Sequence, residues 1–175
     1  MVDLAAASAA PARRIVVRPL RPADVAPLET LIRSVENFSP AEMDCAVELV
    51  ALAAGPSPGA DDYKVLVAET PAGGPPVAYA CFGPTPMTRS TWDLYWIAAA
   101  PSVRGTGCGR MLHAEVERAV RAAGGRRLRV ETSSKQDYDA TCRFYERAGY
   151  RLAGRVERFY ADDDDLLILI CEMKG

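Results

Sequence analysis

The sequence is poor in residues that bind metals or form disulfides. It has a single histidine, His113, and five scattered cysteines, none of which belongs to a Cys-x-x-Cys pair. A zinc site of the usual spacing needs several such ligands close together, so the sequence predicts no metal ion. An odd number of dispersed cysteines does not indicate a disulfide framework either. We therefore expect reduced thiols in a cytoplasmic protein.

Long apolar runs and an excess of positive charge are also missing. No stretch comes near the roughly 18 uninterrupted apolar residues that indicate a transmembrane helix. Residues 1–12 are rich in alanine but lack the basic flank of a signal peptide. The net charge of −2 provides no sequence-wide positive field. We therefore expect no membrane partner and no nucleic-acid partner.

What is present fits one globular domain. The 175 residues are 49% hydrophobic and 25% charged, which is ordinary for a soluble domain with a core of its own. No internal repeat and no second core is visible. We expect a disordered tail over residues 1–12 and a single domain over residues 13–175.

The spacing of apolar residues predicts a mixed fold. In chain order the expected elements are a strand at 15–20, helices at 24–36 and 40–54, strands at 64–70, 77–82 and 91–99, a helix ending near 123, a strand at 127–133, a helix from 137 or 138 to 149, and strands at 150–157 and 166–171. This order indicates an α+β fold, with a mainly antiparallel sheet of about seven strands and about four helices. The long helix ending near 123 forms a parallel crossover.

Local signals mark where several of these helices begin and end. Asp24 is expected to cap the first helix, and Ser39 with Glu42 forms a capping box at the start of the second. The pair Gly124-Gly125 ends the long helix.

A glycine-rich turn, Arg104-Gly-Thr-Gly-Cys-Gly-Arg110, lies between a strand and the long helix. Alternating glycines allow a tight curl with several N–H groups pointing into one concavity, and the helix start adds unsatisfied donors. Such a turn suits a phosphate or pyrophosphate. A P-loop would need Gly-Lys-Ser/Thr, which is absent. A dinucleotide fingerprint would need glycine at Arg110, and a meander rather than a β-α-β unit precedes the turn.

The motif that does fit is Arg104-x-x-Gly107-x-Gly109. With the surrounding segment 94–110 and the segment Phe144-Tyr-Glu-Arg-Ala-Gly-Tyr150, it resembles the GNAT superfamily of N-acetyltransferases. The resemblance extends over residues 15–173, in element order as well as in motif. Residues 130–134 and 159–160 also resemble a branch of that superfamily that acts on small molecules.

The resemblance implies that the chain uses acetyl-CoA as cosubstrate. The backbone amides of the turn would hold the coenzyme A pyrophosphate, at Arg104, Gly105, Thr106, Gly107, Cys108, Gly109 and Arg110. The backbone of Ile97, Ala98 and Ala99 would pair with the pantetheine arm as an added strand would, where the two central parallel strands splay apart. Thr141 and Tyr145 belong to the expected cofactor contacts too.

The resemblance also implies that Tyr145 is the general acid that protonates the departing thiolate; otherwise it is a packed aromatic beside Phe144. Glu131 is the first candidate for the general base, unless it only pairs with neighbouring arginines, and Asp93 is the second. The family often has asparagine seven residues before the tyrosine, where this chain has Tyr138.

Other polar residues are expected to be structural. His113 is expected to be solvated near Glu117, and Cys108 to be buried rather than a nucleophile, so transfer is direct. The acidic run 162–165 is expected to be a solvated turn. Several aromatic side chains could line an acceptor pocket, although aromatic residues on strands usually belong to the core. They are Trp92, Tyr95, Trp96, Phe159 and Tyr160.

The sequence therefore predicts an N-acetyltransferase that acts on a small-molecule, amino-acid or peptide amine in a ternary complex. Two alternatives stay open. The first is a non-catalytic acyl-CoA-binding sensor on the same fold, and the second is a dinucleotide-binding oxidoreductase suggested only by the glycine count. The oligomeric state is open as well, with a homodimer among the alternatives.

Overall fold

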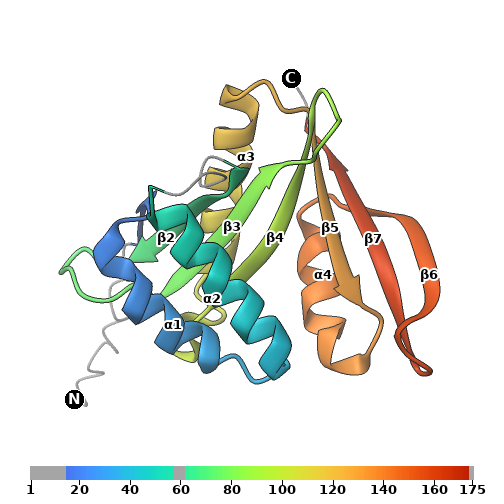
Figure 1. The fold of residues 1–175 in the computed structure, drawn as a ribbon, viewed down its shortest axis with the longest axis horizontal. Coiled ribbons are helices and arrows are strands. Elements are labelled where there is room, and N and C mark those ends of the chain that lie inside the picture. Colours follow the sequence, from blue (N-terminus) through green and yellow to red (C-terminus); the bar gives the residue numbers. More distant parts are fainter. Residues whose placement is uncertain (1–14, 57–61, 174–175) are drawn as a thin grey trace, which may run out of the picture.

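A computed structural model describes residues 15–56 and 62–173, which form one layered α+β structure (Figure 1). Its sheet has seven strands in the order β1-β2-β3-β4-β5-β7-β6. The strands are β1 (Val16–Pro19), β2 (Lys64–Glu69), β3 (Ala78–Pro84), β4 (Thr91–Ala99), β5 (Arg127–Ser133), β6 (Arg151–Ala161) and β7 (Asp164–Glu172). Only β4 and β5 pair in parallel; the other neighbours are antiparallel. The expected fold class is confirmed, whereas the tail expected over 1–12 lies outside the described residues.

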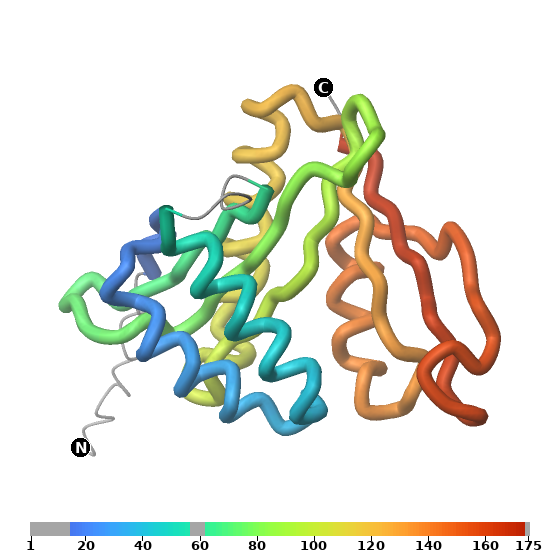
Figure 2. The backbone as a smooth tube through the Cα atoms, viewed as in Figure 1, coloured from blue at the N-terminus to red at the C-terminus, as the bar shows by residue number. Residues whose placement is uncertain are grey.

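The α-helices cover the two faces of the sheet in pairs (Figures 1 and 2). They are α1 (Val25–Arg33), α2 (Pro40–Ala54), α3 (Cys108–Ala122) and α4 (Asp139–Arg147). Leu28 and Ile32 of α1 pack with Val50 of α2 against one face. Leu112 of α3 and Tyr145 of α4 belong to the apolar cluster on the other face. The sheet is thus buried from both sides, as a layered fold requires.

The start of α2 follows its sequence signal, and the start of α1 does not. The Ser39 hydroxyl accepts a hydrogen bond from the Glu42 amide, and the Glu42 carboxylate accepts one from the Ser39 amide at 2.8 Å. Asp24 does not cap α1, because its carboxylate accepts from the Arg21 amide at 2.7 Å and pairs with Arg18 at 2.6 Å. The helix α1 ends at Arg33 rather than near residue 36, since successive short turns lead from it into residues 34–39.

The last two strands are longer than expected, because acidic residues of the run 162–165 are paired within the fold. Asp164 accepts hydrogen bonds from the Ser133 hydroxyl at 2.6 Å and the Ser134 amide at 3.2 Å. Asp165 accepts from the Arg158 amide at 2.8 Å. Both aspartates are buried, so the expectation of a wholly solvated turn is wrong for this half of the run.

Gly125, just after α3, has no room for a side chain. A Cβ there would lie 2.3 Å from Val120 Cγ1 and 2.7 Å from Trp92 Cδ1, and both neighbours are buried. We expect Gly125→Ala to lower the free energy of unfolding by about 1–3 kcal/mol in urea denaturation, because a packed core resists added volume. Gly154→Ala is the control, since its Cβ would meet Ile168 at an ordinary 3.7 Å. Equal losses in the two variants would contradict this explanation.

Candidate active site

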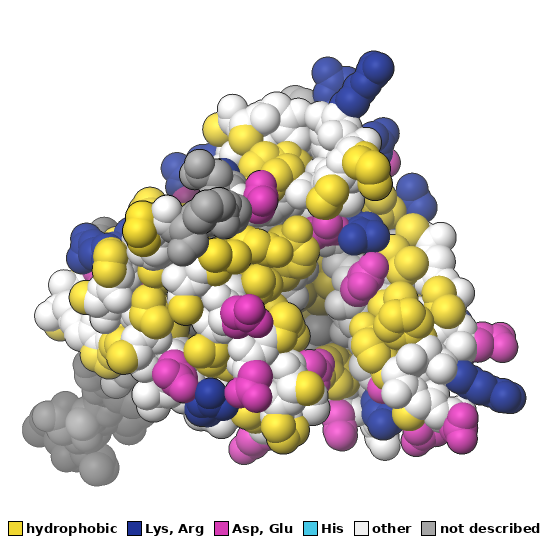
Figure 3. All heavy atoms as spheres, in the orientation of Figure 1, with side chains coloured by type: hydrophobic (Ala, Val, Ile, Leu, Met, Phe, Trp, Pro, Cys, Tyr) yellow, Lys and Arg dark blue, Asp and Glu magenta, His cyan; other side chains and the backbone are white. Residues whose placement is uncertain are grey.

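The two central strands separate part-way along the sheet. Strands β4 and β5 pair only over Thr91–Asp93 and Arg127–Arg129. A register shift in the β3–β4 ladder leaves Tyr95 as the extra residue, and such bulges bend a strand and raise its twist. Beyond the bulge, β4 stays with β3 while β5 stays with β7, so the strands diverge into a V (Figure 1). The space-filling view is hollowed between these halves (Figure 3).

The glycine turn lies at the open end of this splay and leads into α3. Gly105 and Gly107 have φ values of +75° and +86°, a left-handed conformation that only glycine adopts easily. The first helical hydrogen bond runs from the Met111 amide to the Gly107 carbonyl. The amides of the preceding residues 108–110 therefore have no acceptor within the helix. These donors and the positive end of the helix dipole form a site suited to an anion.

The expected burial of Cys108 is confirmed. Its side chain is buried in the core cluster under α3, and burial raises the pKa of its thiol. A thiol that is harder to ionise is a poor nucleophile. The arrangement therefore supports no acyl-enzyme at this position.

Tyr145 of α4 is buried, with 4% of its surface exposed. Its ring packs against Phe144 and Tyr150, at centroid distances of 5.3 and 5.1 Å. Burial raises the pKa of its phenol above the ordinary value of 10, so the hydroxyl carries its proton at neutral pH. Thr141 lies one turn earlier on the same helix and is partly buried. The structure thus offers a protonated phenol on the helix that flanks the splay.

The two carboxylates expected as candidate bases have different surroundings. Asp93 is buried and accepts hydrogen bonds from Arg129 Nε at 2.5 Å and the Thr85 hydroxyl at 2.9 Å. It joins β4 to β5 at their last paired position, which is a structural task. Glu131 lies beyond that pair, with 43% of its side chain exposed and one oxygen 3.3 Å from Arg129 Nη1. Only Glu131 is therefore open to solvent within the splayed part of β5.

The family model of the GNAT acetyltransferases matches residues 34–150, which include both the splay and the glycine turn. The chain belongs to the GNAT acetyltransferase family. The resemblance drawn from the sequence is confirmed. A comparison with curated protein sequences finds no significant match.

Solved structures agree with this assignment. A protein of Desulfovibrio desulfuricans assigned to the GNAT family is 39% identical, covers 91% of this chain and 99% of its own, and has a TM-score of 0.85. Aminoglycoside 6'-acetyltransferase type Ii is 20% identical, with an alignment that covers 91% of this chain and 98% of the other, and has a TM-score of 0.75. The protein yncA of Salmonella typhimurium, solved with its cofactor acetyl-CoA, is 18% identical and has a TM-score of 0.69. Its alignment covers 93% of this chain and 95% of the other. The last two show the shared fold alone.

His113 of this GNAT domain is not solvated, contrary to expectation. Only 4% of its surface is exposed, and its Nε2 lies 3.0 Å from the Tyr150 hydroxyl. Its ring packs edge-on against Phe144 at 5.9 Å, and its Nδ1 lies 4.0 Å from Glu117. The helix α3 thus faces α4 as well as the sheet. Gly109, one turn before His113, faces the same ring, since a Cβ there would meet Phe144 at an ordinary 3.6 Å.

The burial of His113 predicts a specific dependence of stability on pH. Burial lowers the pKa of the imidazole below 6.5, against the opposing charge of Glu117, so the unfolded chain takes up this proton at a higher pH than the folded chain. The contribution of His113 to the free energy of unfolding is therefore fully present above pH 6.5. It is lost as the pH falls from 6.5 towards the lower pKa of the folded imidazole. Urea denaturation between pH 7.5 and 5.5 should show a smaller loss for His113→Gln than for the wild type. Equal losses would contradict this account.

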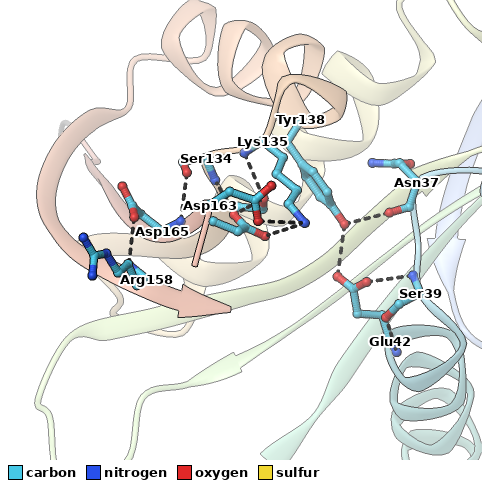
Figure 4. A network of polar contacts seen from close by, with 11 residues as sticks. Asn37, Ser39, Glu42, Ser134, Lys135, Tyr138, Arg158, Asp163 and Asp165 are labelled. Carbon is cyan, nitrogen blue, oxygen red and sulfur yellow. Dashed lines mark hydrogen bonds and ion pairs between the residues drawn. The ribbon is translucent and has the colours of Figure 1, made fainter. Parts of the chain in front are cut away.

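Tyr138, which replaces the family's frequent asparagine, reaches across the splay. Its hydroxyl donates to the Asn37 carbonyl at 2.8 Å and lies 3.1 Å from Glu42 Oε1 (Figure 4). Sequence reasoning missed this contact, because the partners are 101 and 96 residues away.

The aromatic residues expected near an acceptor pocket separate into three groups. Trp92 is buried in the core, whereas Phe159 and Tyr160 are exposed near the β6–β7 turn. Trp96, on the splayed part of β4, packs against Phe38 at 5.1 Å. Tyr95, the extra residue of the bulge, packs against Tyr63 at 5.4 Å. Only Tyr95 and Trp96 therefore lie on the splayed part of β4.

A separate hollow of about 630 Å³ lies beside the β6–β7 turn, with Arg155, Arg158 and Asp165 in its lining. The Asp165 carboxylate is occupied there by the Arg155 guanidinium and the Arg158 backbone amide, which is a structural arrangement within the β6–β7 turn. Among the described residues, no group of three or more His, Cys, Asp or Glu could hold a metal ion. No helix in the described ranges is long and apolar enough to cross a bilayer.

Proposed function

We propose that the protein transfers the acetyl group of acetyl-CoA to a primary amine, by direct attack within a ternary complex. The observation that carries this proposal is the glycine turn, with its unsatisfied amides, at the open end of the β4–β5 splay. An anion-binding turn next to an unpaired strand edge suits a cosubstrate that has a pyrophosphate at one end and a peptide-like arm.

In this proposal the cosubstrate lies along the open edge of β4. The pyrophosphate is held by amides between Gly105 and Arg110, of which those of Cys108, Gly109 and Arg110 are free of helical acceptors. The expected contribution of Arg104 and Thr106 is not retained, because their amides donate to the Pro101 and Val103 carbonyls at 3.2 and 3.3 Å. Beyond the last β5 pair, Ala100 donates to the Val77 carbonyl, so by alternation the backbone groups of Ala98 face β3. The backbone groups of Ile97 and Ala99 point the other way, into the splay, and are available to the pantetheine amides. Small side chains at Ala98 and Ala99 allow close approach. Thr141 and Tyr145 contact the arm from α4.

The reaction begins when the neutral amine nitrogen attacks the thioester carbonyl carbon. The tetrahedral intermediate expels the thiolate as the C–S bond breaks, and the Tyr145 hydroxyl donates the proton that forms the CoA thiol. The proton lost by the attacking nitrogen passes through water to Glu131, the carboxylate exposed to solvent in the splay. Glu131 then releases its proton to bulk water and the phenolate takes one up from it, so both groups are regenerated and the cycle is complete. A backbone N–H near Ala98 or Ala99 stabilises the oxyanion.

The two substrates meet from opposite faces of the sheet. The glycine turn leads into α3, which lies with α4 on one face, so the cosubstrate enters from that side. The acceptor amine then approaches from the α1–α2 face, where Trp96 and the loop 34–39 border the opening. This arrangement lets both substrates bind before any bond is formed.

The test is to incubate the protein with acetyl-CoA and a panel of primary amines while free thiol is measured. We expect thiol release that depends on the amine, with a KM for acetyl-CoA of about 1 µM to 1 mM. The pairing of Glu131 with Arg129 favours one alternative, a non-catalytic acyl-CoA sensor. Calorimetry showing tight CoA binding, without transfer to any amine, would support the sensor instead. No affinity for CoA would contradict both.

A further inference from the structure

The open end of the β4–β5 splay is bridged on the α1–α2 face by a polar contact. Tyr138, in the short helix η4 (Gln136–Tyr138), donates to the Asn37 carbonyl at 2.8 Å and lies 3.1 Å from Glu42 Oε1. We call these three residues the Tyr138 clasp (Figure 4). It joins an element that follows β5 to the loop and helix on the α1–α2 face.

Both ends of the clasp are anchored. The second oxygen of Glu42 accepts from the Ser39 amide at 2.8 Å, so the capping box of α2 fixes the carboxylate that faces Tyr138. On the other side, the Ser134 amide donates to Asp164 at 3.2 Å, which ties the segment before η4 to the β6–β7 turn. Burial and the charge of Glu42 raise the pKa of Tyr138, so its hydroxyl stays protonated and able to donate.

The clasp turns an open slot into a bounded opening. At one end β4 and β5 are held by the pairs over 91–93 and 127–129, and at the other end the clasp spans the gap. The loop 34–39 cannot easily move aside, because Phe38 packs against Trp96 of β4 at 5.1 Å. The clasp and the Phe38–Trp96 contact therefore border the splay on the α1–α2 face.

We propose that the Tyr138 clasp limits the width of the acceptor, so that unbranched primary amines are preferred to amines branched beside the nitrogen. The inference rests on the proposed acetyl transfer and names the substrate class of that same site. A bulkier acceptor would have to break the hydrogen bond to Asn37 and the contact with Glu42. Because the net gain from a protein hydrogen bond is modest, the two contacts together can discriminate by about tenfold, or about 1.4 kcal/mol.

The first test compares kcat/KM for an unbranched and an α-branched amine of similar basicity. Tyr138→Phe removes only the hydroxyl, and we expect the preference for the unbranched amine to fall by about tenfold while the Kd for CoA stays within about twofold. Glu42→Gln, which preserves a capping box, should shift the preference less in the same direction. Tyr63→Phe is the control, because its ring packs on Tyr95 outside the clasp. An unchanged preference in Tyr138→Phe would overturn the inference.

A second test does not depend on turnover. With the protein in excess over CoA, the thiol of bound CoA is alkylated by iodoacetamide or by the bulkier N-phenylmaleimide, and the CoA adducts are separated from the protein. We expect Tyr138→Phe to raise the rate of CoA alkylation by the maleimide relative to the rate with iodoacetamide. Equal rate ratios in variant and wild type would overturn the clasp alone. Absence of CoA binding to the wild type would overturn the proposed function and the clasp with it.

Discussion

The Tyr145→Phe variant is expected to lose about a hundredfold in kcat, while its KM for acetyl-CoA stays within about twofold of the wild-type value. The substitution removes a single oxygen from a side chain that is 4% exposed, so the packing against Phe144 and Tyr150 is retained. What is lost is the proton for the departing thiolate. An interaction made only in the transition state lowers kcat and leaves ground-state binding intact.

The state of the Tyr145 hydroxyl supports this role. Burial raises the pKa of the phenol, so it holds its proton over the whole range in which the folded protein would be assayed. Among the described residues the hydroxyl has no hydrogen-bond partner, and it is not among the fully enclosed polar atoms. A hydroxyl with a proton to donate and no internal acceptor is suited to a group that arrives with the substrate.

The control for Tyr145→Phe is Tyr150→Phe, the same chemical change 5.1 Å away in the same aromatic cluster. Tyr150 donates to or accepts from His113, so its hydroxyl has a structural partner. We expect Tyr150→Phe to lower the melting temperature while kcat stays near the wild-type value. Wild-type kcat in Tyr145→Phe, measured by thiol release, would leave that residue as a packed aromatic and remove it from the acid role.

Elements bounded by strong local signals could be predicted from the sequence almost to the residue. The strand at 127–133 follows a helix-ending glycine pair, and Ser39 with Glu42 defines the start of α2, because these signals act through the backbone of neighbouring residues. The glycine turn was predictable for the same reason, since its left-handed φ values restrict the residue type. Asp164 was not, because its burial depends on Ser133, which is distant in the sequence.

The candidate site was predictable only where it is built from backbone. His113 was missed because the helix pattern reveals one buried stripe, whereas its second contact depends on where α4 packs. The choice between Asp93 and Glu131 needed the cross-strand position of Arg129, which contacts both carboxylates. The partners of Tyr138 leave no local trace at all. Side-chain roles therefore depend on tertiary neighbours, and backbone roles on local sequence.

The second large effect is expected at the glycine turn, where Gly107→Ala should weaken acetyl-CoA binding by about tenfold or more. Gly107 has a φ of +86°, and a Cβ added there would meet nothing within 4 Å, so backbone conformation alone opposes alanine. A left-handed residue other than glycine costs about 1–2 kcal/mol. The turn can relieve that strain only by rotating its peptides, which redirects the amides proposed to hold the pyrophosphate.

Gly124 provides the matched control at the opposite end of the same helix. Its φ is +81°, and a Cβ there would also meet nothing within 4 Å. Gly124→Ala and Gly107→Ala should therefore lose similar amounts of stability in urea, about 1–2 kcal/mol each. Calorimetry with acetyl-CoA should separate them, because only Gly107 lies where helix donors are unsatisfied. If the two variants bound acetyl-CoA with equal affinity, the backbone strain at Gly107 would have no effect on the ligand beyond that at Gly124. The proposed cosubstrate site would then be wrong.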